Sequence, residues 1–308
     1  MSTLLIFGVG GFVGPYLAKE FKENGYSVYG SDVLESCNNE YLEDYFKCDI
    51  LNKDSMKNLL EAVKPTHIIN LAAISSVGQS WKIPEITMNV NVNGTLNIFN
   101  SCLAVGIKPR ILLIGSSEEY IPSDSPINEE TPINANNPYG ISKIAQEQFA
   151  AIYRDTYNWP IYCVRAFNHI GVGQRDTFVI PSWCKQVAMI EKGEKEPKLI
   201  VGNLEVARDF TDVRDIVKAY KLVIESDYCH EVFNLGSGNA YKLKDILNAL
   251  LSFSTKSIEI VIDSSLLRKN DNKIICCDPS KANKLLGWKA VIPFEETIKS
   301  LFDNYLKQ

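Results

Sequence analysis

Several features that define whole classes of protein are missing from this sequence. Its eight cysteines include no C-x-x-C pair, which argues against a zinc site, and they indicate a reduced protein of the cytoplasm. The three histidines are too scattered along the chain to suggest metal ligands. No apolar run approaches the roughly 20 residues that cross a membrane. We therefore expect a cytoplasmic protein with no metal and no membrane partner.

A surplus of positive charge is also missing. The 32 lysines and arginines against 37 aspartates and glutamates give a net charge of −5, the wrong sign for a protein that holds nucleic acid across a broad surface. With 45% hydrophobic and 22% charged residues, the composition is that of a globular protein and not of a disordered one. A length of 308 residues allows one or two domains.

Apolar runs of strand length alternate with longer amphipathic segments from the first residues onward. This alternation is typical of βαβ units and predicts an α/β fold with a parallel sheet. The predicted strands are Leu4–Phe7, Ser27–Gly30, His67–Leu71, Ile111–Ile114, Ile161–Arg165 and Val232–Leu235. The predicted helices are about Phe12–Asn24, Lys53–Val63, Ile86–Val105 and Tyr139–Tyr157.

The second half of the chain departs from this rhythm. Ile121–Pro138 is rich in proline, asparagine and serine and is too long for a simple connection, so it is a candidate binding loop. The pattern is irregular after Phe167, which predicts a smaller lobe made from separate pieces. We expect residues 1–166 with 209–238 to form a doubly wound Rossmann-type core. Residues 167–208 with 239–308 would form a discontinuous α/β lobe that binds the substrate.

A glycine-rich turn follows the first predicted strand. The strand ends in Gly8-Val9-Gly10-Gly11-Phe12-Val13-Gly14, directly before a helix. Gly8 permits a tight turn, Gly11 lets the backbone approach a pyrophosphate, and Gly14 lets the helix pack closely on the strand. The phosphates of a dinucleotide would then lie at the positive end of that helix. Glycines also close ordinary loops, but this placement favours dinucleotide binding.

An acidic residue follows at the distance expected for a ribose contact. Asp32 lies just after the second predicted strand, about 20 residues beyond the turn, where a carboxylate can accept hydrogen bonds from the adenosine ribose. It would repel a 2′-phosphate, which favours NAD(H) over NADP(H), although Asp32 could instead cap a turn. Asp49 and Ile50 follow the third strand position, where the Asp49 carboxylate could meet the adenine amino group or simply face solvent.

A candidate catalytic set lies further along the chain. Tyr139 and Lys143 begin the helix after Pro138, and their spacing places both on one face. A lysine ammonium beside a phenol favours the phenolate and lowers its pKa, so the phenol could exchange a proton with a substrate oxygen. Such a pair is also common on surface helices. Ser116, just after the fourth predicted strand, adds a hydroxyl where ligands of open α/β sheets bind.

The chain resembles the extended short-chain dehydrogenase/reductase family that acts on nucleotide sugars, and the resemblance covers essentially all of it. Within that family it is most similar to the GDP-4-dehydro-6-deoxy-D-mannose reductases, also called GDP-6-deoxy-4-keto-mannose reductases. The stretches that carry the likeness are Ile114–Tyr120, Pro138–Lys143, Phe167–Gly171 and Gly202–Val213. The resemblance implies that Ser116, Tyr139 and Lys143 are catalytic, with Asn93 supporting the lysine through a water.

The same resemblance implies where a cofactor and a substrate bind. The implied cofactor residues are Gly8, Gly10, Gly11, Phe12, Val13, Gly14, Asp32, Asp49, Ile50, Leu71, Ala72, Ala73, Tyr139 and Lys143. The implied substrate residues are Ser75, Ser117, Glu118, Asn168, Arg208 and Arg268, with the two arginines on the diphosphate. Arg208 could instead form an ion pair with Asp212 or Asp215, and Arg268 could lie in a solvated loop.

The activity implied by the resemblance is reduction, by NADH or NADPH, of the C4 ketone of a nucleotide-linked 4-keto-6-deoxy sugar, giving GDP-D-rhamnose from GDP-4-keto-6-deoxy-mannose. Glu118 supports an alternative, because a glutamate in this place removes a sugar proton in the similar GDP-mannose 4,6-dehydratases. A 4-epimerase that recycles NAD is a further alternative. Glu118 could also simply accept hydrogen bonds from backbone amides of its loop.

Two further points concern the assembly and the substrate loops. In the family, paired long helices form a four-helix bundle across a homodimer, although here the apolar residues of those helices could face the sheet instead. Ile121 follows Tyr120 where glycine is usual, and Lys269 and Asp271 replace the proline and glutamate of an Arg-Pro-x-Glu motif. We therefore expect the substrate loop and the nucleoside contacts to differ from those of the family.

Overall fold

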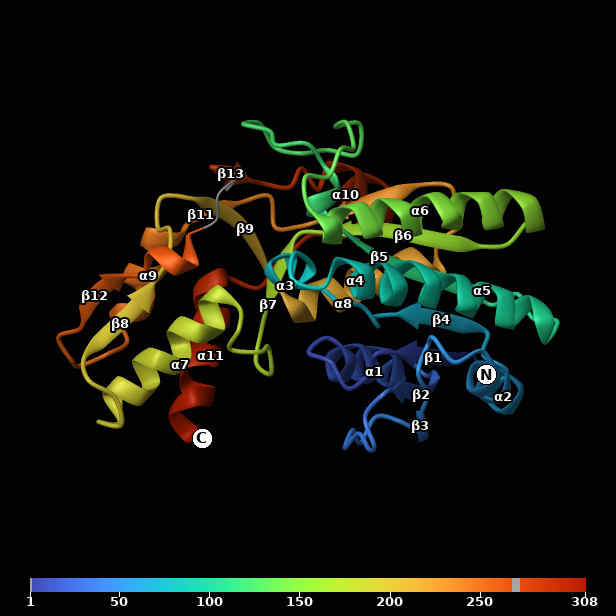
Figure 1. Ribbon diagram of the computed structural model, residues 1–308, viewed down its shortest axis with the longest axis horizontal. Coiled ribbons are helices and arrows are strands. Elements are labelled where there is room, and N and C mark those ends of the chain that lie inside the picture. The colour runs from blue at the N-terminus through green and yellow to red at the C-terminus, as the bar shows by residue number, and fades with distance from the viewer. Residues whose placement is uncertain (1, 268–271) are drawn as a thin grey trace.

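A seven-stranded parallel sheet forms the larger part of the molecule (Figure 1). The structure is a computed structural model that describes residues 2–267 and 272–308. Every neighbouring pair of strands in this sheet is parallel, which confirms the predicted α/β class. In spatial order the strands are β10 (Val232–Leu235), β6 (Ile161–Ala166), β5 (Arg110–Ser116), β4 (His67–Asn70), β1 (Thr3–Phe7), β2 (Ser27–Asp32) and β3 (Asp44–Lys47).

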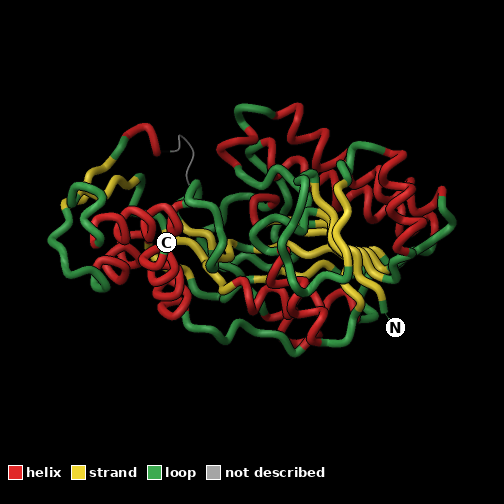
Figure 2. Tube along the Cα trace, turned by 90° about the horizontal axis from the view of Figure 1, so that it is seen from below, coloured by secondary structure: helices red, strands yellow, loops and turns green. Residues whose placement is uncertain are grey.

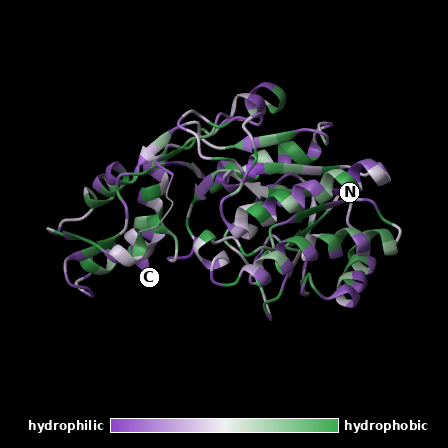
Figure 3. Cartoon of the chain, turned by 45° about the horizontal axis from the view of Figure 1, so that its top comes forward, coloured by the Kyte–Doolittle hydropathy of each residue, from purple (hydrophilic) through white to green (hydrophobic). Residues whose placement is uncertain are grey.

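Helices cover both faces of this sheet (Figure 2). The core on one face includes residues of α1 and α8, and the core on the other includes residues of α2, α5 and α6. Each helix packs on the sheet because apolar residues recur on one side of it. Figure 3 shows hydrophobic and hydrophilic residues alternating along these helices. Their bounds are α1 (Gly14–Glu23), α2 (Lys53–Val63), α5 (Gly94–Ala104), α6 (Pro138–Tyr157) and α8 (Val213–Glu225).

The order of the strands reverses next to β1. From β1 the chain moves outward to β2 and β3 on one side, and then returns to β4 on the other. Ligands of doubly wound sheets bind outside the carboxyl ends of the strands at such a reversal. The loops after β1 and β4 therefore flank the expected binding crevice.

The long helix predicted over Ile86–Val105 is interrupted. It consists of α4 (Pro84–Met88), a π-helical turn η1 (Asn89–Asn93) and α5, preceded by the short α3 (Val77–Ser80). A π-helical turn adds a residue to one turn, so it rotates the side chains on either side of it relative to a regular α-helix. Asn91 and Val92 are the buried residues of this turn.

A second group of elements lies beside the large sheet (Figure 1). Strand β9 (Ala207–Asp212) pairs with β7 (Asn168–Ile170), β11 (Ala240–Lys242) and β13 (Ile274–Ile275), and β8 (Lys198–Val201) pairs with β12 (Glu259–Ile262). A shared hydrophobic core packs these strands against helices. The helices are α7 (Val179–Glu191), α9 (Leu243–Leu251) and α11 (Phe294–Lys307). The sequence pattern missed β7 and β8, which have three and four residues, and β9, whose six residues include two aspartates, an arginine and a threonine and so do not form an apolar run.

The division of the chain into two lobes remains a prediction. Two features of the structure concern the residues at which one lobe would end and the other begin. Strand β9 begins before residue 209 and pairs only with strands of the smaller group. Helix α10 (Ser280–Leu286) contributes Ala282 to the core of the large sheet, and Trp288, which follows the helix, also belongs to that core.

Among the described residues no helix is both long and apolar enough to cross a membrane. All eight cysteines lie in the described part of the chain and are free thiols.

Candidate active site

The glycine-rich turn after β1 closes against the loop after β4. Gly8 has a φ of +77°, and a Cβ there would come within 2.6 Å of the backbone nitrogen of Ala72. A Cβ on Gly14 would collide with the carbonyl oxygen of Val9, so only glycine lets α1 begin this close to the strand. Gly11 N–H donates to Gly8 O at 3.1 Å. The tight turn and close helix packing predicted for this segment are therefore present.

Phe12 and Val13 connect this turn to the rest of the molecule. Both are partly buried and pack against the core beneath α1. The Phe12 ring stacks on His169, with the ring centroids 6.1 Å apart and the planes at 14°. Burial lowers the pKa of His169, whose Nδ1 lies 3.1 Å from Phe167 O. The sequence analysis did not connect His169 with the glycine-rich turn.

Asp32 caps the turn as well as facing the predicted ribose position. Its Oδ2 accepts a hydrogen bond from Gly10 N–H at 3.0 Å, and its Oδ1 accepts one from Val33 N–H at 2.8 Å. Lys47 lies opposite Asp32 in the register of β2 and β3, so a cation far along the chain is near in space. The Lys47 ammonium forms an ion pair with Glu35.

The other predicted cofactor residues follow β3 and β4. Asp49 is exposed, while Ile50 is buried and its carbonyl accepts a hydrogen bond from Asn97 Nδ2 at 3.1 Å. Three half-buried residues follow β4, at the point where the strand order reverses. They are Leu71, Ala72 and Ala73. Ser75, a predicted substrate residue, is exposed in the loop that continues from them.

Ser116, Tyr139 and Lys143 are brought together at the carboxyl end of β5. Ser116 ends that strand, and its hydroxyl is hydrogen-bonded to the Tyr139 hydroxyl. Lys143 lies one turn further along α6, with its Nζ 5.7 Å from the centroid of the Tyr139 ring. The three residues are only 7%, 9% and 4% exposed, respectively. The tyrosine and lysine are therefore buried together and do not lie on a helix surface.

Burial dominates the ionisation of this pair. It raises the pKa of Tyr139 above the ordinary phenol value, although the hydrogen bond to Ser116 acts in the opposite direction. It lowers the pKa of Lys143 to about 8, against the effect of the Glu119 carboxylate. The pKa of Tyr139 is thus raised and not lowered, contrary to the sequence-based argument, because the loss of water around the phenol outweighs its neighbours.

Glu118 is held at the start of α6. It is half-buried, and its Oε2 accepts a hydrogen bond from Asn137 Nδ2 at 2.9 Å. Asn137 is the N-cap of α6, where its Oδ1 accepts from Gly140 N–H at 2.9 Å. The Glu118 carboxylate is therefore oriented by a side-chain amide, not by backbone amides of its own loop. Its charge contributes to the raised pKa of Tyr139, which places the two groups near one another.

The asparagine next to the catalytic helix is Asn91, not Asn93. Asn93 is exposed and donates a hydrogen bond to Asn89 at 2.9 Å, and its support of Lys143 through a water stays a prediction. Asn91 is 0% exposed and donates to Ser142 Oγ of α6 at 2.8 Å. Its Oδ1 accepts from the backbone of Ile74 at 2.8 Å, after β4. Asn91 therefore joins the loop after β4 to the catalytic helix.

The residues predicted to hold the substrate are spread over several elements. Ser117 is buried directly after Ser116, and Asn168 is exposed at the start of β7. Arg208 lies on β9, where its Nη1 donates to the carbonyls of Ala207 at 2.8 Å and of Asn272 at 2.7 Å. Arg268 lies outside the described residues.

The two aspartates considered as ion-pair partners of Arg208 are bonded elsewhere. Asp212 pairs with Arg214 at 2.8 Å, and Asp215 lies 3.5 Å from Lys218. Among residues 2–267 and 272–308, no group of three or more histidine, cysteine or acidic side chains could hold a metal ion.

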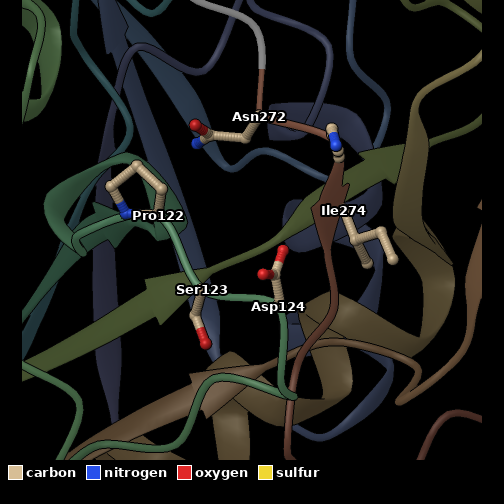
Figure 4. A pocket seen from close by; sticks show the side chains of 6 residues that line it. Pro122, Ser123, Asp124, Asn272 and Ile274 are labelled. Carbon is tan, nitrogen blue, oxygen red and sulfur yellow. The ribbon is translucent and has the colours of Figure 1, made fainter.

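A cavity of about 270 Å³ opens beside the segment that anchors Arg208. One wall is the start of the candidate binding loop, and the other is the chain entering β13 (Figure 4). The lining residues are Pro122, Ser123, Asp124, Asn272, Lys273 and Ile274. Sequence reasoning marked the loop but not residues 272–274, because no local pattern shows that β13 pairs with β9.

Comparison with known proteins places this site in a family. The family profile described as GDP-mannose 4,6 dehydratase matches residues 5–301. The GDP-6-deoxy-D-mannose reductase of Pseudomonas aeruginosa is 29% identical over 99% of this chain and 97% of its own. GDP-mannose 4,6 dehydratase 1 of Arabidopsis thaliana is 26% identical over 98% of this chain and 89% of its own.

Solved structures agree with these matches. The structure of RMD from Pseudomonas aeruginosa complexed with NADPH has a TM-score of 0.88 and 28% identity, and covers 100% of this chain and 99% of that one. UDP-glucose 4-epimerase from Brucella ovis, in complex with NAD, has a TM-score of 0.87 at 23% identity over 99% of each chain, which shows a shared fold.

The fold and the buried Ser116, Tyr139 and Lys143 are those of an extended short-chain dehydrogenase/reductase that modifies nucleotide sugars. More narrowly, the chain belongs to the GDP-mannose 4,6 dehydratase family of nucleotide-sugar epimerases, dehydratases and reductases.

Proposed function

We propose that this protein reduces the C4 ketone of a nucleotide-linked 4-keto-6-deoxy sugar, with GDP-4-keto-6-deoxy-mannose as substrate and GDP-D-rhamnose as product. The observation that carries the proposal is the buried set of Ser116, Tyr139 and Lys143 at the carboxyl end of β5. The likeness to a GDP-6-deoxy-D-mannose reductase over 99% of the chain supports the GDP-linked substrate.

The crevice between the loops after β1 and β4 suits a nicotinamide dinucleotide. The glycines keep the turn free of side chains, and a Cβ on Gly10 would come within 2.7 Å of Leu34 and 3.1 Å of Asp32 Oδ2. Pyrophosphate would lie at the N-terminus of α1 and the adenosine ribose near Asp32. The bound cofactor supplies a hydride for C4 of the sugar.

The protein's own residues then handle the proton. Tyr139 donates its hydroxyl proton to the developing alkoxide at C4, and Ser116 donates a hydrogen bond to the same oxygen. Lys143, while charged, stabilises the phenolate left on Tyr139. Arg208, held by two backbone carbonyls, presents a guanidinium to the substrate diphosphate. The candidate loop 121–138 and Asn168 lie on the substrate side in this proposal.

The test is a direct assay on purified protein. Incubation with GDP-4-keto-6-deoxy-mannose and NADH or NADPH should oxidise the cofactor and yield a sugar whose C4 carries hydrogen, as read by NMR of the product. Conversion of GDP-mannose to the 4-keto-6-deoxy sugar without added cofactor, with no reduction of the ketone, would show that the reductase proposal is wrong.

The second candidate is 4,6-dehydratase chemistry, and the position of Glu118 favours it. The carboxylate is oriented by Asn137 and lies near Tyr139, as a base for a sugar proton must. Under this candidate Glu118→Gln abolishes turnover of GDP-mannose. Under the reductase proposal the same variant keeps reduction of the ketone within a few-fold. A 4-epimerase would interconvert sugars with no net use of cofactor.

We further propose NAD(H) as the preferred cofactor, because the Asp32 carboxylate lies where a 2′-phosphate would approach. The ratio of kcat/KM for NADH to that for NADPH tests this, and Asp32→Ser should shift the ratio toward NADPH. A wild-type ratio that favours NADPH would contradict the preference. The NADPH complex of the Pseudomonas aeruginosa relative makes this test necessary.

The proposed setting is a cytoplasmic homodimer built through a bundle of four helices. Its support is the exposed apolar surface of α4 and α6, which we treat in the Discussion. We also propose that the group around β9 closes over the substrate as a separate lobe. Limited proteolysis with and without GDP tests whether the group around β9 closes as a separate lobe. Cell fractionation tests whether the protein is cytoplasmic.

A further inference from the structure

Asp209 is a buried carboxylate next to Arg208 that the proposed mechanism does not use. The two residues are consecutive on β9, so their side chains point to opposite faces of the strand. Arg208 is half-buried, whereas Asp209 is 0% exposed. A carboxylate withdrawn from water is costly unless hydrogen bonds compensate. The donors that compensate therefore indicate what Asp209 holds in place.

The first segment bonded to Asp209 is the loop after β10. Oδ1 of Asp209 accepts hydrogen bonds from Ser237 N–H at 2.8 Å and from the Ser237 hydroxyl at 2.7 Å, and Oδ2 accepts from Gly238 N–H at 2.9 Å. Gly236 makes room for this loop, because a Cβ there would come within 2.4 Å of the Cys277 Cβ. Strand β10 lies at the edge of the large sheet, so Asp209 ties β9 to that sheet.

The second segment bonded to Asp209 contains β13. Oδ2 of Asp209 also accepts from Cys277 N–H at 3.1 Å, after this strand. At the other end of the segment, the carbonyl of Asn272 accepts from Arg208 Nη1 at 2.7 Å. Between these two contacts β13 pairs with β9. Arg208 and Asp209 therefore hold the same segment, one at each end.

This segment in turn anchors the candidate binding loop. Ile127 N–H donates to Cys276 O at 2.8 Å, and Asp278 N–H donates to Ile127 O at 2.9 Å. Ile127 is only 2% exposed, so this part of the loop is fixed inside the molecule. The cavity described above lies between Pro122–Asp124 of the loop and residues 272–274 of the segment (Figure 4). Both walls of the cavity are therefore joined to the segment that Asp209 holds.

The bonds to Asp209 suit a carboxylate and not an amide. Each of its oxygens accepts two hydrogen bonds. Burial raises the pKa of Asp209, and the hydrogen bonds from Ser237, Cys277 and Gly238 counteract that rise. Asparagine has nearly the same size but offers one acceptor oxygen, and its NH₂ group would face two of the donors. The Asp209→Asn variant therefore breaks these contacts with little change in volume.

We propose that Asp209 is a positioning residue for substrate binding, whose carboxylate holds the segment 272–278, and with it Arg208 and the candidate binding loop, at the end of β10. The proposal rests on the role proposed above for Arg208 in binding the substrate diphosphate. Its consequence is that the guanidinium and both walls of the cavity keep a fixed position relative to the large sheet. The glycine-rich turn after β1 takes no part, so the affinity for the cofactor is independent of Asp209.

Amide hydrogen exchange tests the anchoring without cofactor or substrate. In Asp209→Asn the exchange of Ile127 N–H should become roughly tenfold faster. This amide bonds to Cys276, so it reports on the segment and not on a bond to Asp209 itself. Ser237→Ala, which removes only one of the four donated bonds, should accelerate the same amide by a smaller factor. Unchanged exchange at Ile127 in both variants would overturn the proposal.

Asp215 supplies the matched control. It is 1% exposed, and its Oδ2 accepts from the backbone amides of residues 291 and 292, both at 2.8 Å. Asp215→Asn should therefore accelerate exchange at those two amides and leave Ile127 N–H unchanged. Equal acceleration of Ile127 in Asp209→Asn and Asp215→Asn would mean a general loss of stability and would also overturn the proposal.

The consequence for the substrate is read from GDP binding by calorimetry. Arg208→Gln and Asp209→Asn should each raise the dissociation constant of GDP by roughly tenfold, and the double variant should lose little more, because both changes act through one guanidinium. The dissociation constant of NADH in Asp209→Asn, and that of GDP in Asp215→Asn, should match the wild type. Unchanged GDP binding in Asp209→Asn alone would overturn this inference. Unchanged GDP binding in Arg208→Gln would overturn the proposed role of Arg208 as well.

Discussion

Burial governs the chemistry of the single residues at this site, because it favours the neutral form of each titratable group. The pKa of the Tyr139 phenol is raised, so it keeps its proton at neutral pH. Such a phenol releases its proton only when a strong base, such as an alkoxide, forms beside it. Reduction of a ketone produces such an alkoxide on the substrate. Oxidation of an alcohol would first require Tyr139 to be in its phenolate form. In its protonated form Tyr139 is suited to donate a proton.

Replacement of Tyr139 tests this assignment. Tyr139→Phe keeps the ring that packs beside Lys143 but removes the proton donor. We expect kcat to fall by roughly 10²- to 10⁴-fold, while the dissociation constant of the cofactor changes little. Steady-state kinetics and quenching of protein fluorescence by the cofactor measure the two quantities. Tyr153→Phe, on the same helix with its hydroxyl bonded to Asn100, is the matched control and should keep full turnover.

His67 at the start of β4 predicts an acid-sensitive stability. Burial, together with the Arg110 charge, lowers its pKa from 6.5 to about 4. Between these values the unfolded chain binds a proton that the folded chain does not, so stability present above pH 6.5 is lost as the pH falls toward 4. Across that window the wild type should lose on the order of 3 kcal/mol more than His67→Gln in urea denaturation.

The exposed His230 provides the control for this measurement. Its side chain is 71% exposed, and His230→Gln should follow the wild type at every pH. Identical pH dependence for His67→Gln and the wild type would show that His67 does not carry the effect.

Local patterns predicted the candidate catalytic residues but not the residues bonded around them. Ser116, Tyr139 and Lys143 follow from a strand end and one helical turn, and the structure brings them together. Asn91 was not predicted, because its bonds to Ser142 and to Ile74 join residues 51 and 17 positions away along the chain, which no local pattern indicates. The carbonyl of Asn272, which holds Arg208, lies 64 residues away along the chain, and no local pattern indicates such a contact.

At the scale of elements, the first turn of α6 links stability to function. Asn137 caps the helix through Gly140 N–H and also orients Glu118, while the same turn carries Tyr139 and the next carries Lys143. Asn137→Ala should lower the free energy of unfolding by about 1 kcal/mol through loss of the cap. It should also lower kcat, because Tyr139 lies in the turn that the cap fixes. Denaturant titration and steady-state kinetics measure the two effects.

Asn52 supplies the matched control for that prediction. It caps α2 through Asp54 N–H at 3.1 Å and Ser55 N–H at 3.0 Å, away from the catalytic residues. Asn52→Ala should cost a similar free energy of unfolding with unchanged kcat. An equal loss of kcat in both variants would mean that turnover follows global stability and not the position of α6.

The elements that sequence patterns predicted are those with enough residues to show a period. Six of the seven strands of the large sheet were predicted, and β6, an apolar run of six buried residues, illustrates why. The edge strand β3 was missed, because none of its four residues is buried. Strands β7, β11 and β13 have only three, three and two residues. Their existence depends on pairing with β9, which is a long-range interaction that composition does not reveal.

At the scale of the whole molecule, the positive charge that matters for ligand binding is that of particular sites and not the net charge of the protein. A net charge of −5 disfavours polyanions across the surface as a whole. The proposed ligands nevertheless carry diphosphates, and the proposed contacts for them are the N-terminus of α1 and the side chain of Arg208. The first follows β1, and the second lies near the start of β9. Binding of anions therefore depends on the fold and not on the overall composition.

The outer surface of α6 carries the prediction of a dimer. The helix turns Tyr139 and Lys143 inward, while Ile141 and Ile152 are 49% and 57% exposed on its outer side. Helix α4 packs beside α6 and exposes Ile86 by 52%. Apolar side chains gathered on neighbouring helices are expected to be covered by a partner, and a second copy offers the same surface.

Charged substitutions on this surface should separate the two copies. In the double variant with Ile141→Asp and Ile152→Asp, each aspartate would be buried without a partner, so the protein should sediment as a monomer at concentrations where the wild type is a dimer. Ile262→Asp, which is 64% exposed on β12 in the other group of elements, is the matched control and should leave the dimer intact. A wild type that sediments as a monomer, or a double variant that remains a dimer, would contradict the helical bundle, because either result requires these isoleucines to face water in the assembled protein.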